Sequence, residues 1–146
     1  MTLYQTQETQ QNLDRRTAQR LGPEQIVRLA QSLPADDRLL LERRFADGLT
    51  ATDIARRSRR SAASIRLRID RLTKRLASPE FRFTLLHQDK LPRTMRRTAT
   101  LLFIQGRSLR ETARLTRKTL HRIRCDRATL QTLALVQELS EDSAQL

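Results

Sequence analysis

The sequence predicts an all-α protein made of two tandem helix-turn-helix units, and three observations lead to this fold class. First, residues 33–72 align without a gap on residues 91–130. Second, the apolar residues of both copies recur at helical spacing. Third, the excess of positive charge falls in the same window of each copy. A small helical unit that is present twice accounts for all three observations.

The repeat includes residues that set backbone geometry as well as arginines. Eleven of the forty aligned positions are identical, among them the pairs Pro34/Pro92 and Gly48/Gly106. Chance similarity between two arginine-rich helices would match arginines, but it would not bring two of three glycines and two of four prolines into register. Duplication is therefore the better interpretation.

The first unit is expected over residues 23–78 and begins with two helices. Pro23 stands in the first turn of one helix, where proline is tolerated, and the second helix covers residues 35–47. Gly48 then supplies the permissive residue that ends the second helix. The buried candidates of this helix are Leu39, Leu40, Leu41 and Phe45.

The last two helices of the first unit form the predicted helix-turn-helix. Thr50, with Asp53 as the partner in a capping box, is expected to cap a short helix that buries Ile54. Residues 58–60 then form the connection to a longer helix, which Ser61 caps and which reaches about Ala77. The expected apolar seam of that helix is Ile65, Ile69, Leu72 and Leu76.

The second unit is expected over residues 79–138. Its long helix is expected over residues 119–137, with a seam of Ile123, Leu130 and Ala134. Outside the two units, the sequence predicts a flexible polar segment at residues 1–22 and an acidic tail at residues 139–146.

The positive charge is confined to the two helix-turn-helix windows. The chain has 29 Lys and Arg against 16 Asp and Glu, a net charge of +13. Residues 49–76 hold nine basic and two acidic residues, and residues 107–134 hold eight and two, whereas the remainder balances. A generally arginine-rich surface would not place its excess at the same position in both copies, but contact with phosphates would. Double-stranded DNA is therefore the expected partner.

Residues 33–76 also follow the pattern of a known family. They run from Leu-Pro through an apolar helix ending in Phe, a Gly-x-Thr turn and an acidic-Ile-Ala step to a Ser-capped helix with an Ile-Arg pair and a late Lys-Arg-Leu. This pattern resembles region 4 of bacterial sigma factors of the sigma-70 family and the related sigma-like helix-turn-helix regulators, and residues 91–130 share the resemblance through the repeat. It implies that residues 61–67 begin a recognition helix.

The candidate DNA contacts lie in the turn and at the start of the long helix of each unit. By the same resemblance, Ala62, Ala63 and Leu67 occupy base-contact positions, where they can touch a thymine methyl group but cannot form bidentate hydrogen bonds. Arg122 is the best candidate for a guanine contact. The expected set is Arg59, Arg60, Ser61, Ala62, Ala63, Ser64, Arg66, Leu67, Arg71, Arg117, Lys118, Thr119, His121, Arg122, Arg124 and Cys125.

Other chemistry has little support in the sequence. His87 and His121 stand apart from any second ligand, so no metal site is expected, and no cofactor or catalytic site is expected either. Cys125 is the only cysteine, and no stretch has the ~20 apolar residues that span a bilayer. We therefore expect a protein of the bacterial cytoplasm, on the nucleoid, that is not an enzyme and has no membrane partner.

The expected function is that of a transcription regulator that binds duplex DNA with full or partial sequence specificity. The alternative is an adaptor. Because sigma region 4 also docks on RNA polymerase and on activators, a duplicated version with little base readout would bind such proteins through Ala62, Ala63 and Leu67. The sequence leaves open the oligomeric state, the orientation of the two units and whether both units contact DNA.

Overall fold

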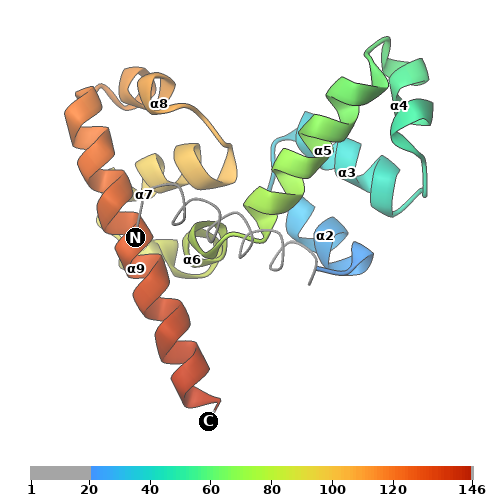
Figure 1. Ribbon diagram of the computed structural model, residues 1–146. Helices are drawn as coiled ribbons and strands as arrows, with labels where there is room; N and C mark the ends of the chain where they lie inside the picture. Colours follow the sequence, from blue (N-terminus) through green and yellow to red (C-terminus); the bar gives the residue numbers. More distant parts are fainter. Residues whose placement is uncertain (1–20, 146) are drawn as a thin grey trace, which may run out of the picture. The chain divides into compact units, whose positions relative to one another are not determined.

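The computed structural model describes residues 21–145, and Figure 1 shows them as helices joined by short connections. No residue in this part of the chain belongs to a β-strand, so the predicted all-α class is confirmed. The chain divides into two compact units, one ending at Ser78 and the other beginning at Pro79. The expected flexible segment at residues 1–22 lies almost entirely outside the described residues.

The first unit is built from four described helices around a small aliphatic core. These helices are α2 (Pro23–Ala30), α3 (Ala35–Phe45), α4 (Ala51–Ser58) and α5 (Ala62–Leu76). Leu41 of α3, Ile54 of α4 and Leu72 of α5 are almost fully buried. An ion pair of 2.7 Å between Asp37 and the Arg68 guanidinium ties α5 to α3 at the edge of this core.

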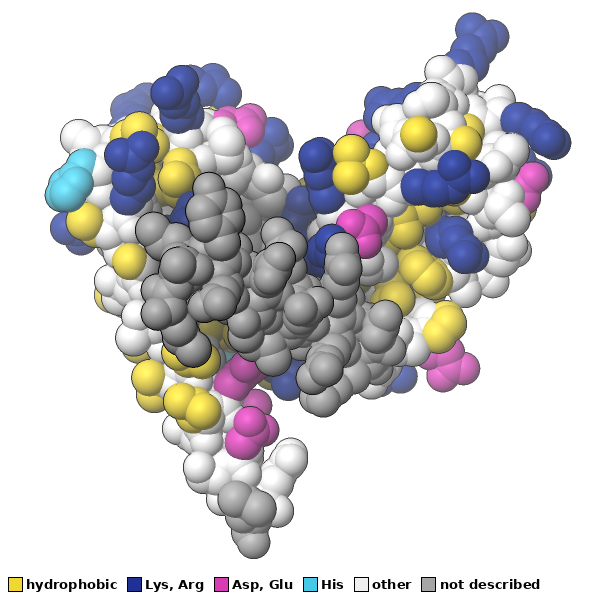
Figure 2. Space-filling view, in the orientation of Figure 1, with side chains coloured by type: hydrophobic (Ala, Val, Ile, Leu, Met, Phe, Trp, Pro, Cys, Tyr) yellow, Lys and Arg dark blue, Asp and Glu magenta, His cyan; other side chains and the backbone are white. Residues whose placement is uncertain are grey.

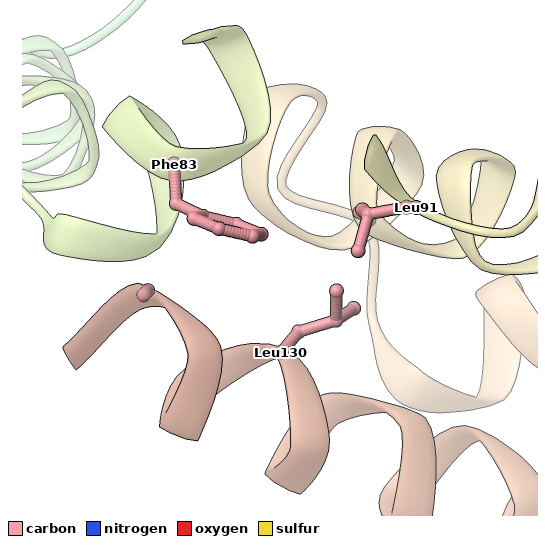
Figure 3. Packing of buried hydrophobic residues seen from close by; sticks show 5 residues of the cluster. Phe83, Leu91 and Leu130 are labelled. Atoms are coloured by element: carbon pink, nitrogen blue, oxygen red, sulfur yellow. The ribbon is translucent and has the colours of Figure 1, made fainter. Parts of the chain in front are cut away.

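The second unit contains the equivalent helices, with a longer final helix. These are α6 (Pro79–His87), α7 (Arg93–Ala99), α8 (Leu109–Thr116) and α9 (Leu120–Ala144); a 3-10 turn covers Gln88–Lys90 and a π-helical turn covers Thr100–Ile104. Phe83 of α6, Leu91 and Leu130 of α9 point toward one another in the buried cluster (Figure 3). Met95 and Phe103 pack against the edge of that cluster.

Both units end the helix that precedes α4 or α8 in the same way. Gly48 and Gly106 have φ angles of 72° and 67°, in the left-handed region where glycine has no steric penalty. The following residues, Leu49 and Arg107, donate their amides to the carbonyl groups of Arg43 and Leu101 at 3.0 and 2.8 Å. The glycines that the sequence aligned thus have the same backbone role in both units.

Two expectations about burial are wrong. Leu39 is 44% exposed, because three consecutive leucines cover about 200° of a helix and α3 turns only Leu40 and Leu41 toward the core. Phe45 is only partly buried, and the Arg44 guanidinium lies over its ring, 5.4 Å from the ring centre. Phe45 therefore lies at the edge of the core.

The last helix is longer than the sequence indicated. We expected α9 to end near Gln137, but it continues to Ala144. No glycine or proline interrupts residues 138–144, and Glu, Leu and Ala among them favour helix. Within the described residues, the predicted acidic tail is thus mostly a continuation of α9.

Replacing Gly48 tests the left-handed turn. Gly48→Ala should lower the free energy of unfolding by about 1–2 kcal/mol, because no atom lies within 4 Å of the added Cβ and the cost is conformational. Gly48→Asn should lower the free energy of unfolding by less, since asparagine tolerates the left-handed region. Urea unfolding followed by circular dichroism would measure both variants, and an unchanged stability in Gly48→Ala would contradict the turn.

Candidate nucleic-acid interface

The short helix of each unit ends in an arginine with left-handed backbone geometry. Arg59 after α4 has φ 55° and ψ 35°, and Arg117 after α8 has φ 57° and ψ 34°. The next amide closes the turn in both units, from Arg60 to Ala55 at 3.3 Å and from Lys118 to the carbonyl of Ala113 at 3.1 Å. This geometry costs a residue with a Cβ about 1–2 kcal/mol, so glycine would be the favoured residue for the backbone alone. Both units nevertheless have arginine there, and both arginines are exposed.

The start of the short helix is fixed by a hydroxyl side chain in each unit. Thr50 accepts a hydrogen bond from the Asp53 amide at 3.2 Å, and the Asp53 carboxylate accepts bonds from the Thr50 amide and hydroxyl at 3.1 and 2.8 Å. The side-chain and backbone bonds from Thr50 hold the pKa of Asp53 below its usual range, with weaker help from nearby arginines. Ser108 caps α8 by accepting from the Glu111 amide at 3.1 Å.

The first residues of α5 form a small, largely uncharged surface with arginines beside it. Ser61 caps the helix by accepting from the Ser64 amide at 3.1 Å. Ala63, Ser64 and Leu67 are exposed, with half of the Leu67 surface accessible, and Ala62 is half-buried. The basic residues around this surface, all exposed, are Arg59, Arg60, Arg66 and Arg71.

The first residues of α9 present a more polar surface. Thr119 caps this helix by accepting from the Arg122 amide at 3.1 Å. His121, Arg122, Arg124 and Cys125 are exposed, and the His121 Nε2 atom lies 3.6 Å from the Cys125 sulfur. In Figure 2, basic side chains surround the end of each unit that carries its α4–α5 or α8–α9 turn.

Lys118, unlike the other predicted DNA contacts, points into the second unit. Its ammonium group donates to the Asp126 carboxylate at 2.9 Å, to the Thr98 hydroxyl at 3.1 Å and to the Thr94 carbonyl at 3.1 Å. The Asp126 side chain is only 4% exposed, and a buried carboxylate needs such a partner. Lys118 therefore compensates a buried charge inside the unit.

Asp126 also forms an ion pair with Arg122, the best candidate for a base contact. Its second carboxylate oxygen lies 3.2 Å from the Arg122 Nε atom, while 66% of the Arg122 side chain stays exposed. The fixed Nε atom directs the guanidinium group, and the side chain remains accessible to a ligand. Asp126 is thus a positioning residue for Arg122.

Asp126 was not among the residues predicted from the sequence to contact DNA or to pack in the core. The available signal was its place on α9, three residues after Ile123 and four before Leu130, which puts it on the buried side of the helix. Its partner Lys118 lies in the turn before the helix, and helical spacing does not predict a contact across a turn. The first unit has Arg60 and Arg68 at these two positions and lacks this network.

A shallow hollow occurs at the same place in both units, beside the capped start of the short helix. In the first unit its volume is about 410 Å³, and in the second about 280 Å³. The equivalent lining pairs include Phe45/Phe103 and Thr50/Ser108, while Arg127 in the second unit stands where the first has Ile69. Both hollows are open to solvent, so neither encloses a small molecule.

Comparison of the chain with protein-family models, curated proteins and solved structures finds no match. Within residues 21–145, no helix has the length and apolar character needed to cross a bilayer. The same residues contain no group of three or more His, Cys, Asp or Glu side chains placed to hold a metal ion.

Removing the Asp126 charge tests the network in the second unit. Asp126→Asn should lower the free energy of unfolding by about 3 kcal/mol, because Lys118 loses the carboxylate that compensates its own burial. The matched control is Asp70→Asn, whose ion pair with Lys74 at 2.8 Å is exposed. That variant should lose less than about 0.5 kcal/mol. Equal losses in guanidinium chloride unfolding would contradict a buried network.

Proposed function

We propose that the protein is a duplex-DNA-binding transcription regulator in which α4–α5 and α8–α9 act as two helix-turn-helix units. The observation that carries this proposal is the repeated turn, in which an exposed left-handed arginine leads into a hydroxyl-capped helix with an accessible first turn. The concentration of the net positive charge in these two segments supports it, since nucleic-acid phosphates require such a surface. The resemblance of residues 33–76 to sigma region 4 supports the same assignment.

The two units would contribute different contacts. In the first unit, Ala63 and Leu67 face outward beside Arg59 and Arg66, which suits thymine methyl groups and phosphates. In the second unit, Arg122 is exposed and held at Nε by Asp126, which leaves its terminal nitrogens for a guanine edge. Sequence preference would therefore come mainly from the second unit.

Two weakly binding units in one chain would have a higher affinity for DNA than either unit alone, without further contacts. Once one unit is bound, the second meets DNA at a high effective concentration. A semi-specific regulator of the bacterial nucleoid would gain most from this arrangement, because phosphate contacts dominate its binding.

An adaptor for RNA polymerase or another regulator is the second candidate. The observation that favours it is the half-exposed Leu67 beside Ala63, an apolar surface that also suits a protein partner. Recovery of polymerase with the tagged protein after nuclease treatment, together with no binding to duplex DNA, would select this function.

Binding of a mixed-sequence duplex at several salt concentrations tests the proposed function. Fluorescence anisotropy should show a loss of affinity of about 1,000-fold between 50 and 200 mM salt, as six or more phosphate contacts require. Arg66→Glu combined with Arg124→Glu should weaken binding to any sequence. The charge-matched control is Arg28→Glu with Lys90→Glu, which reverses exposed charges outside the turns. A flat salt response, or equal losses in both double variants, would refute DNA binding by this surface.

Replacing both left-handed arginines with glycine distinguishes their effect on stability from their effect on DNA binding. Arg59→Gly with Arg117→Gly should raise the free energy of unfolding by about 1 kcal/mol, because the steric cost removed at each position exceeds the entropy that each glycine adds to the unfolded chain. The same variant should bind duplex DNA about 10-fold more weakly, since two phosphate contacts are lost. Increased stability with unchanged DNA affinity would show that these arginines do not touch DNA.

A further inference from the structure

The second half of α9 exposes a row of large apolar side chains. Leu135, Val136 and Leu139, which lie within about 100° of the circumference of α9, are 55%, 55% and 59% exposed. Figure 2 shows hydrophobic side chains along this projecting part of α9, with acidic groups beside them. Single exposed leucines are common, but a contiguous row of this kind marks an interaction surface.

The row continues toward the start of α9 with the spacing of a coiled-coil seam. Cys125, Ala128, Thr132, Leu135 and Leu139 alternate in steps of three and four residues, and all five are exposed. They lie opposite the buried side of the helix, which contains Ile123, Leu130 and Ala134. One face of α9 therefore serves the core of its unit, and the other face is open for a second helix.

The charges along this seam have opposite signs at its two ends. Arg124 flanks its start and Asp142 flanks its end, on the same side of the helix. The acidic end thus has an excess of negative charge that a cationic helix would neutralise.

We propose that this seam binds a second copy of the chain, with the two α9 helices antiparallel. An antiparallel pair places the acidic end of each helix beside the basic end of the other, whereas a parallel pair would place like charges together. It can lay Leu139 on Ala128 and Leu135 on Thr132 of the second copy, so that large side chains face small ones. A twofold axis relates the two copies, so that both use the same surface and the assembly stops at a dimer.

Pairing has a consequence that rests on the proposed function. Cys125 lies in the seam and Arg124 flanks it, so a second copy and DNA would compete for the start of α9. The α5 surface of the first unit is not part of the seam. Self-association would then compete with DNA contacts made by Arg124 at the start of α9.

Sedimentation of the full chain without DNA tests the pairing. The wild-type protein should be a dimer at micromolar concentration, and Leu135→Glu with Leu139→Glu should raise its dissociation constant at least about 30-fold. The control is Leu39→Glu, which places the same charge at an exposed leucine of the first unit and should leave the dimer intact. Circular dichroism should show unchanged helix content in each variant. A wild-type monomer up to 200 μM, or equal dissociation by the control, would overturn the proposal.

Disulfide cross-linking tests the direction of the pair. Antiparallel helices in this register hold the two Cys125 residues about 25 Å apart and bring the two Thr132 positions close together. Oxidised wild-type protein should therefore stay uncross-linked, while Cys125→Ser with Thr132→Cys should form a covalent dimer. The opposite pattern would overturn the antiparallel arrangement. Both experiments omit DNA, so their failure would leave the proposed DNA binding intact.

Discussion

The left-handed turn at Arg59 and Arg117 is the constraint on which the rest of each unit depends. It changes the direction of the chain within three residues, so that the short helix packs against the long one, and Ile54 and Ile65 are buried between them in the first unit. The same turn leaves the hydroxyl-capped start of the long helix at the surface. Arginine in place of glycine makes the turn less stable and more cationic, and the proposed contact with phosphates would offset that cost.

The two units keep this frame but distribute their internal charges differently. In the first, the long helix supplies the cation, and Arg68 pairs with Asp37 on α3. In the second, the long helix supplies the anion, and Asp126 draws Lys118 of the turn inward. One basic group of the second turn thereby compensates a buried charge, while the Arg122 side chain stays exposed beside Asp126. The duplicated frame can thus carry two different binding surfaces.

Local patterns predicted most of the fold. Helix starts at Thr50 and Ser61, the glycine turn at Gly48 and the buried side of α5 depend on near neighbours in the chain, and the structure has them where the sequence indicated. The Lys118 side chain points inward because it pairs with Asp126 across the turn, and neither helical periodicity nor helix propensity predicts such a contact. The length of α9 was missed because its acidic residues suggested a tail, although nothing among them breaks a helix.

Backbone amide shifts during a DNA titration would show whether the two equivalent turns contact the same duplex, as proposed. With the ¹⁵N-labelled chain and a duplex of about 25 base pairs, we expect the largest shifts at residues 59–67 and 117–125 once DNA is in excess. Shifts limited to residues 133–139, or no shifts in either turn at low salt, would contradict the proposal.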